Sequence, residues 1–176
     1  GTGTFGEGLL FEASVEGEAF AIDPKSGDVV WQTTYVEQAD AGNLSDLLYY
    51  DGLVYIGVQS VSEGLDAGFP DFEPTFRGNV VALNAQNGEI IWRTYLVEPP
   101  QNGAAMWSSF ALDPELNAIY FTTSNNYTGE ASLTSDAIIS LDAKSGEMRW
   151  AAQTTSGDVW TPAEPYGADY GYGAGA

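Results

Sequence analysis

The sequence predicts an all-β fold made of about three β-propeller blades, and three observations carry this prediction. One pattern occurs three times, as AIDPKSGDVVW (21–31), ALNAQNGEIIW (82–92) and SLDAKSGEMRW (140–150). Successive copies stand about 60 residues apart, which is enough chain for a four-stranded unit with an insertion. Short runs of alternating polarity flank each copy, and no stretch shows convincing helical periodicity.

Each copy of the pattern is predicted to be a β-hairpin. Its Asp or Asn side chain caps the turn, and its glycine supplies the positive φ that a tight reversal needs. The strands that enter the hairpins include 78–83 and 137–141, and the return strands end in a tryptophan. We expect these tryptophans in the core, docked between adjacent blades. They are Trp31, Trp92 and Trp150.

Further segments complete the expected domain, a partial propeller over residues 1–176. Strands are predicted at 53–57, after Asp51-Gly52, and at 118–122. Residues 61–75 are predicted to be a loop insertion, and the Gly/Tyr/Ala-rich end segment 166–176 is expected to fray. Closed propellers use about four to eight blades, so we expect the rest of a propeller, or other copies of the chain, to cover the open edges.

Composition excludes several function classes. Twenty-five acidic residues against five basic ones give a formal net charge of -20, which argues against nucleic acid as a partner. No apolar run approaches the ~20 residues of a membrane-spanning helix. The absence of cysteine and histidine excludes disulfides, zinc sites with thiolate or imidazole ligands, and catalytic triads that use either residue. Oxygen ligands remain, and they suit hard cations such as Ca²⁺.

The repeat resembles that of the pyrroloquinoline quinone (PQQ)-dependent alcohol dehydrogenases. The segments between its copies most resemble the polyvinyl-alcohol dehydrogenase-like branch of that family. The resemblance spans roughly residues 14–160. The segment MWSSFALDPELNAIYFTTSNNY (106–127) is similar to the family's "W-S-S … D-P … N … Y … T-G-N-N-Y", and TFRGNVVAL (75–83) to "T-F-R-G-S-V-V-A-L" of that branch. The resemblance implies a larger, eight-bladed propeller.

The resemblance also implies a site. In the family the tryptophan at the position of Trp107 stacks on the quinone, and the asparagine at Asn125, 18 positions later, is a calcium ligand. Ser124 stands where the family usually has glycine, and we expect it to tighten or shift the Asn125 loop. QTTSGDVW (153–160) resembles "Q-x-T-x-x-D-x-W", which makes Asp158 the general base beside the calcium and the quinone.

One further loop, YIGVQSVSE (55–63), resembles the one that brings a glutamate to the metal. Glu63 is then the third metal ligand and Ser60 a contact of the quinone. Taken singly, Asp158 would more often cap a strand, and Asn125-Asn126 would more often form a turn. The coincidence of Trp107, Asn125 and Asp158 with family positions favours a genuine cofactor site.

The implied activity is oxidation of a small or polymeric alcohol to an aldehyde or ketone. Hydride would pass to PQQ, Ca²⁺ would polarise the quinone carbonyl, and Asp158 would take the hydroxyl proton. The family implies an electron acceptor such as a cytochrome c and a periplasmic or extracellular location. The segment is not expected to be active alone.

Two other functions stay open at this point. The chain would be a non-catalytic propeller, an interaction or structural scaffold, if the parent protein lacks the remaining quinone contacts, notably an arginine after Asp158. It would be a carbohydrate-binding propeller if exposed Tyr and Trp side chains stack on sugars. Co-purification of calcium and quinone would favour the enzyme, and sugar binding without quinone absorbance would favour the last alternative.

Overall fold

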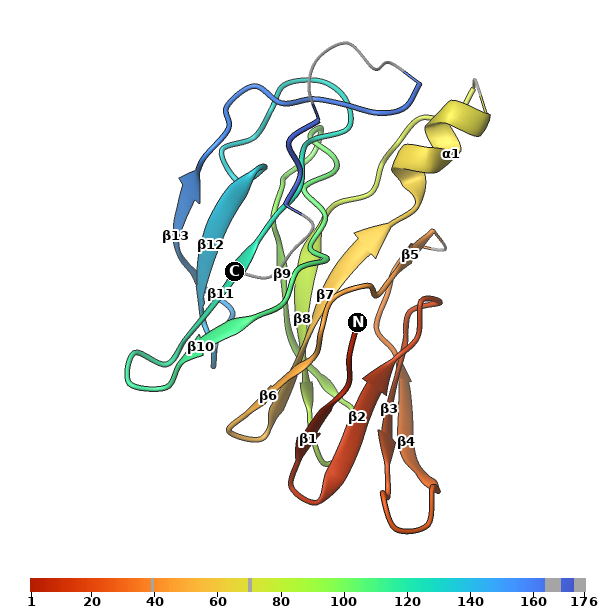
Figure 1. Ribbon diagram of the computed structural model, residues 1–176, viewed down its shortest axis with the longest axis vertical. Helices are drawn as coiled ribbons and strands as arrows, with labels where there is room; N and C mark the ends of the chain where they lie inside the picture. The colour runs from red at the N-terminus through yellow and green to blue at the C-terminus, as the bar shows by residue number, and fades with distance from the viewer. Residues whose placement is uncertain (39, 70, 164–168, 173–176) are drawn as a thin grey trace.

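The computed structural model describes residues 1–38, 40–69, 71–163 and 169–172, and this part of the chain is built almost entirely from β-strands (Figure 1). It confirms the all-β prediction and the partial propeller. The elements, in chain order, are β1 (Thr4–Gly6), β2 (Leu9–Ala13), β3 (Glu18–Ile22), β4 (Val29–Thr34), β5 (Ala41–Gly42), β6 (Leu48–Tyr50), β7 (Leu53–Ser60), α1 (Ser62–Gly68), β8 (Asn79–Asn84), β9 (Ile90–Tyr95), β10 (Ala111–Asp113), β11 (Ala118–Thr122), β12 (Ala137–Asp142) and β13 (Met148–Gln153).

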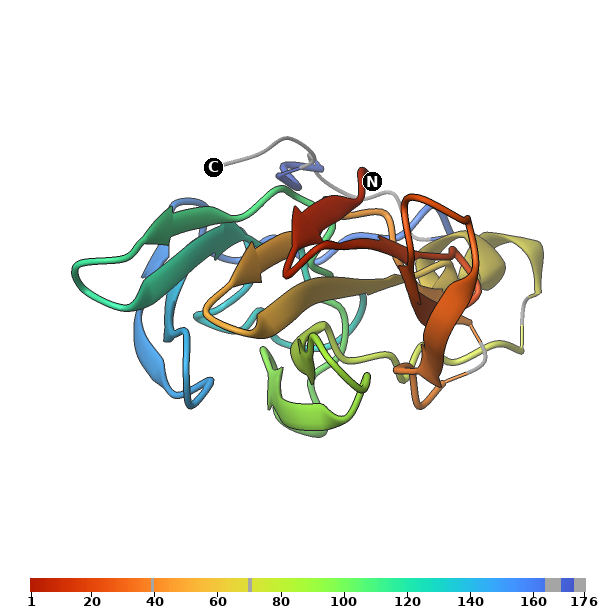
Figure 2. The same ribbon diagram turned by 90° about the horizontal axis from the view of Figure 1, so that it is seen from below.

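The strands form three antiparallel sheets that lie side by side (Figures 1 and 2). We call them blade 1 (β1–β4), blade 2 (β5–β9) and blade 3 (β10–β13). Seen from below, β1 and β10 lie toward one side, and β4, β9 and β13 lie toward the other (Figure 2). In blade 2, β5 and β6 both pair with β7, at different points along it. Residues 43–47 between them therefore lie outside the ladder.

The three predicted hairpins are present. The turns between β3 and β4, β8 and β9, and β12 and β13 each place their glycine at positive φ, between 73° and 80°. In the first turn the Asp23 carboxylate accepts a hydrogen bond of 2.8 Å from the Lys25 N–H. Asn84 and Asp142 cap the other two turns in the same way, at 2.8 and 3.0 Å. The repeated sequence thus encodes one turn geometry three times.

Two of the repeat tryptophans dock one blade onto the next. The indole N–H of Trp31 donates to the carbonyl of Ala85 in blade 2 (2.9 Å), and that of Trp92 donates to the carbonyl of Ala143 in blade 3 (3.2 Å). Each indole lies against the turn glycine of the following blade. A Cβ added to Gly146 would stand 2.6 Å from the Trp92 ring. Glycine is therefore required there both for the left-handed backbone and for the close approach of the indole.

Trp150 corrects the prediction that all three repeat tryptophans belong to the core. Its side chain is 45% exposed, although its ring lies 5.8 Å from that of Tyr120. Trp31 and Trp92 are themselves half-buried and pack at the edge of the core. The difference arises because no turn of a following blade lies against Trp150 in the part of the chain that the structure describes.

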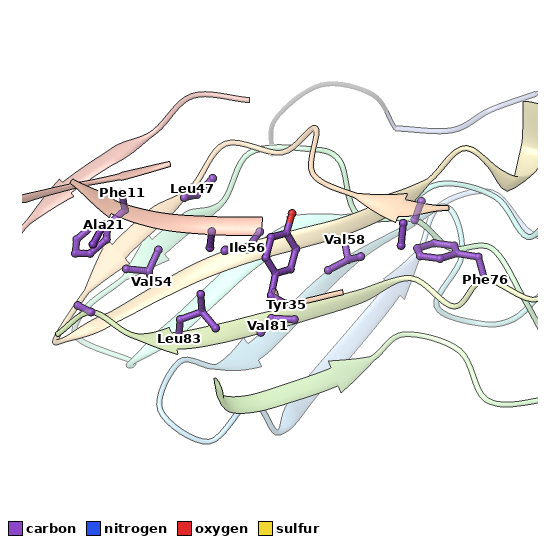
Figure 3. Close-up of a cluster of buried hydrophobic side chains, with 14 of the residues drawn as sticks. Phe11, Ala21, Tyr35, Leu47, Val54, Ile56, Val58, Phe76, Val81 and Leu83 are labelled. Carbon is purple, nitrogen blue, oxygen red and sulfur yellow. The ribbon is translucent and has the colours of Figure 1, made fainter. Parts of the chain in front are cut away.

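The core lies between the blades, and β7 serves both of its halves. Successive side chains of a strand point to opposite faces, so Val54, Ile56 and Val58 pack into a cluster between blades 1 and 2 (Figure 3). Tyr55, on the other face, packs into a second cluster with side chains of blade 3. Burial on both faces fixes the position of β7, whose end at Ser60 borders the candidate site.

The insertion between β7 and β8 contains a short helix that the sequence did not reveal. The prediction of a loop without helix over 61–75 is wrong for α1, whose N-terminal turn is closed by hydrogen bonds from the amides of Gly64 and Leu65 to the carbonyl of Val61. Two glycines in seven residues make its helix propensity weak, so periodicity gave no signal. None of the helical structure in the described ranges is long and apolar enough to cross a bilayer.

Candidate functional site

The candidate site is a cavity of about 410 Å³ at the end of the blades where β7 and β11 finish. Its walls come from the break between β5 and β6, the end of β7, α1, the segment before β10, the loop after β11 and the segments that follow β13 (Figure 1). The lining residues are Leu44, Gln59, Ser60, Gly64, Ala105, Trp107, Ser124, Asn125, Tyr127, Trp160, Pro162, Asp169 and Gly171.

Three of the residues singled out from the sequence line this one cavity: Ser60, Trp107 and Asn125. The Trp107 side chain is 38% exposed and offers a flat aromatic surface to a ligand. Ser60 is buried, and its hydroxyl accepts a hydrogen bond of 3.1 Å from the N–H of Ser62. Three separate segments of the chain therefore meet around one space.

Asn125 presents an oxygen to which no described residue donates. Its side-chain amide donates to the carbonyls of Asn126 (2.9 Å) and Trp160 (2.8 Å), whereas no hydrogen bond from the described residues reaches its Oδ1. Asn126 differs, because its Nδ2 donates to the carbonyl of Asn102 and its Oδ1 accepts two hydrogen bonds from Ser132. The second asparagine thus holds the loop, and the first has an oxygen available for a ligand.

Ser124 ties the Asn125 loop to the segment that carries Trp107. Its N–H donates to the carbonyl of Ala105 (3.0 Å), and its hydroxyl accepts the N–H of the same residue (3.1 Å). A glycine at this position would make only the first of these bonds. The serine therefore adds a side-chain bond between the two walls, which agrees with the expectation of a tightened loop.

Asp158 lies on the chain segment next to Asn125, although it is not part of the cavity wall. Val159 forms a parallel β-bridge with Asn126, and the N–H of Trp160 donates to the Asn126 carbonyl (3.0 Å). The Asp158 side chain is buried, and its Oδ2 accepts the N–H of Tyr170 at 2.9 Å. Its Oδ1 has no hydrogen-bond partner among the described residues.

Glu63 lies in α1, between Ser62 and the cavity-lining Gly64. Its side chain is outside the described part of the structure, so its role as a metal ligand stays a prediction. No three Asp or Glu carboxylates in the described ranges are gathered closely enough to hold a metal ion by themselves. A cation here would need amide or main-chain oxygens as well as carboxylates.

The described residues of the end segment, 169–172, lie against the site. Asp169 and Gly171 line the cavity, Tyr170 bonds to Asp158, and the Tyr172 hydroxyl lies 2.5 Å from the hydroxyl of Thr154. The expectation of a fraying end therefore does not hold for these four residues; the rest of the predicted segment, 166–168 and 173–176, falls outside the described residues. A Gly/Tyr/Ala composition carried no signal for these tertiary contacts.

Asp136 is the second feature that sequence reasoning missed. It immediately precedes β12, its side chain is fully buried, and neither carboxylate oxygen has a hydrogen-bond partner among the described residues. Burial, with smaller contributions from the charges of Asp158 and Asp169, raises the pKa of Asp136 to about 7. None of the five basic residues lines the cavity. The sequence signal that could have revealed it is an acidic residue placed directly before a run of apolar residues.

Comparison with known proteins places these features in a family. Residues 94–170 match the family described as "Glucose/ethanol/alcohol dehydrogenase, beta-propeller domain". Residues 1–101, more than half of the chain, match the propeller family described as "Outer membrane protein assembly factor BamB". The chain belongs to the PQQ-type β-propeller family. Its C-terminal part is similar to the propeller domain of the alcohol dehydrogenases.

One curated relative of this PQQ-type propeller chain is the polyvinylalcohol dehydrogenase of Sphingopyxis sp. (strain 113P3), which is 29% identical over 193 aligned positions. The alignment covers 94% of this chain and 29% of the relative. A quinohemoprotein alcohol dehydrogenase from Pseudomonas putida HK5 has the same fold with a TM-score of 0.76 and 24% identity, over 90% of this chain and 27% of that one. The quinohemoprotein alcohol dehydrogenase of Comamonas testosteroni has a TM-score of 0.75 and 22% identity, over 93% of this chain and 28% of that one. The chain thus spans less than a third of the length of each.

Proposed function

We propose that this chain forms part of the PQQ- and calcium-binding site of an alcohol dehydrogenase that oxidises a secondary or polymeric alcohol to a ketone or aldehyde. The observation that carries the proposal is the meeting of Trp107 and the available Oδ1 of Asn125 in one cavity, with Asp158 on the adjoining segment. The relative named for polyvinyl alcohol supports a polymeric substrate.

The residues present fit both groups. A cavity of about 410 Å³ lies within the range of small-molecule sites, and the partly exposed Trp107 indole is a surface for a planar ring. Hard cations prefer oxygen ligands, and Asn125 and Asp158 each keep an oxygen to which no described residue donates. Glu63, from α1, would add a further carboxylate.

The chain's own residues would divide the chemistry between them. When bound, PQQ accepts hydride from the alcohol carbon, and calcium polarises its carbonyl. Asp158 would take the hydroxyl proton on Oδ1, while the N–H of Tyr170 holds Oδ2 and so limits rotation of the carboxylate. Trp107 would orient the quinone plane, Ser60 would contact its edge, and Asn125 would hold the cation.

The resemblance to the same family supports a proposal for where the protein works. We propose that the protein works in the periplasm or outside the cell and passes electrons to an acceptor such as a cytochrome c. The remaining quinone contacts would come from further blades, or from other copies of the chain.

The experiment that tests the proposal compares two tryptophans of similar exposure. Trp107→Ala is expected to weaken PQQ retention in the presence of Ca²⁺ about tenfold or more, because the stacking surface is lost. Trp150→Ala removes an indole that is 45% exposed and is not part of the cavity lining, so it should leave retention unchanged. Retention is measured by quinone absorbance after gel filtration.

A third variant, studied in the same way, tests the proposed base. Asp158→Asn is expected to keep PQQ retention, while alcohol-dependent dye reduction at saturating Ca²⁺ falls at least a hundredfold, within the range that general-base catalysis supplies. Equal retention of PQQ by the Trp107 and Trp150 variants, or unchanged dye reduction by the Asp158 variant, would refute the proposed site.

A scaffold function is the second candidate, because residues 1–101 match the family described by an outer-membrane assembly factor. A scaffold would bind neither calcium nor quinone at this cavity. Failure of the assembled propeller, in which further blades or other copies complete the site, to retain either group would therefore favour the scaffold over the enzyme.

A further inference from the structure

Asp136 is an acidic residue that no part of the proposed function yet uses. Its side chain has no exposed surface, and both carboxylate oxygens lack a hydrogen-bond partner within the described ranges. The chain forms three salt bridges among its described residues, and none of them includes Asp136. A buried carboxylate without a partner is unfavourable unless it binds a proton or lies near a cation.

The main chain of Asp136 joins the two segments that carry Asn125 and Asp158. Its N–H donates to the carbonyl of Ser124 at 3.1 Å, next to Asn125. Its own carbonyl accepts the N–H and the hydroxyl of Thr154, at 2.9 and 2.8 Å, on the segment that leads to Asp158. Its φ of 48° is the left-handed conformation that non-glycine residues rarely adopt. The backbone therefore holds Asp136 firmly against the two segments that carry Asn125 and Asp158.

The charged groups that act on Asp136 in the described structure are negative. Asp158 and Asp169 are close enough for their charges to raise the pKa of Asp136 further, and no basic residue among those described offsets them. In a poorly hydrated interior a charge acts over several ångströms with less screening than in water. Such a place attracts a positive ion and opposes an anion.

We propose that Asp136 strengthens the binding of a divalent cation held by Asn125 and Asp158, through the charge of its buried carboxylate and without being a ligand. This inference rests on the proposed function, because it requires the cation site at Asn125 and Asp158. It assigns a role to a residue outside the motifs that predicted the site. Loss of the charge should reduce the affinity for the cation by about tenfold or more.

The test measures Ca²⁺ binding to the cation-free chain by calorimetry at about pH 8. Asp136→Asn keeps the size of the side chain and removes the charge, and it is expected to lower the affinity for Ca²⁺ by at least about tenfold. The cation-free variant should melt at the same or a higher temperature than the wild type, because an unpartnered buried charge has been removed. Glu115→Gln, at an exposed turn in the same blade, removes one charge as well and should change the affinity less than about twofold.

The outcomes separate this inference from the proposed function. If the wild-type chain binds Ca²⁺, and Asp158→Ala weakens binding while Asp136→Asn does not, the role of Asp136 is refuted and the site stands. If the wild-type chain binds no Ca²⁺, the proposed cation site itself fails. Asp136→Ser serves as a second variant, and if neither substitution folds without Ca²⁺ the residue is a structural element and the inference is overturned.

Discussion

Replacing Trp92 by alanine tests whether the repeat tryptophans hold neighbouring blades together. The indole of Trp92 donates to the Ala143 carbonyl at 3.2 Å, lies against the Gly146 turn, and packs with its ring centroid 5.8 Å from that of Tyr55. The first two contacts join blade 2 to blade 3, and the third, with Tyr55, lies within blade 2. Truncation would leave a cavity at the interface, and the Ala143 carbonyl would keep only its hydrogen bond from the Tyr55 hydroxyl, at 3.1 Å.

The expected loss in the free energy of unfolding can be worked out from these contacts. A tryptophan buries about 150–250 Å², which at about 25 cal/mol per Å² corresponds to roughly 4–6 kcal/mol if burial were complete. Trp92 is only partly buried, which lowers this figure, and the lost hydrogen bond adds about 1 kcal/mol. We therefore expect Trp92→Ala to lower the free energy of unfolding by about 3–5 kcal/mol, as for other large aromatic deletions.

The assay is urea denaturation followed by far-ultraviolet circular dichroism, which does not depend on the fluorescence of the residue removed. Trp150→Ala is the matched control: it changes the same position of the repeat, but at a side chain that is 45% exposed. It should cost no more than about 1 kcal/mol. Equal losses from the two substitutions would show that docking between blades is not what the tryptophan contributes.

Two further predictions concern a turn glycine and the buried acid. Gly146→Ala, at φ 73° and with its new Cβ only 2.6 Å from the Trp92 ring, is expected to destabilise by about 2–4 kcal/mol. Gly27→Ala is the control, because Gly27 has a similar φ but no atom lies within 4 Å of an added Cβ. In the same urea assay it should lose only the backbone cost of about 1–2 kcal/mol. Equal losses from the two substitutions would contradict the clash with Trp92. The pKa of Asp136 is about 7 in the folded protein against an ordinary 3.8, so the folded state binds the extra proton between these values. The contribution of Asp136 to the stability of the cation-free protein should therefore be greatest below about pH 4 and fall toward pH 7, by at most about 1.4 kcal/mol per pH unit. A pH series of unfolding curves that is identical for Asp136→Asn and the wild type would refute this reasoning.

The repeat could be predicted from the sequence because its information is local. The cap at Asp23, the glycine at Gly27 and the alternating strands on both sides specify a hairpin within eleven residues, whatever lies around it. Spacing between the copies then predicted blades. Residue type predicted the oxygen-ligand chemistry, and family motifs selected Trp107, Asn125 and Ser60, which the fold brings to one cavity.

Only the tertiary structure decided what each of these residues contacts. Trp92 and Trp150 share one motif, yet one docks on a following blade and the other is exposed, because burial depends on what packs against the strand. The fold buries the carboxylate of Asp136 near Asp158, with no hydrogen-bond partner among the described residues. This is a property of packing, so the residues next to Asp136 in the sequence could not predict it. Local sequence thus determined the turns and strands of this protein, and long-range contacts determined which side chains form its site.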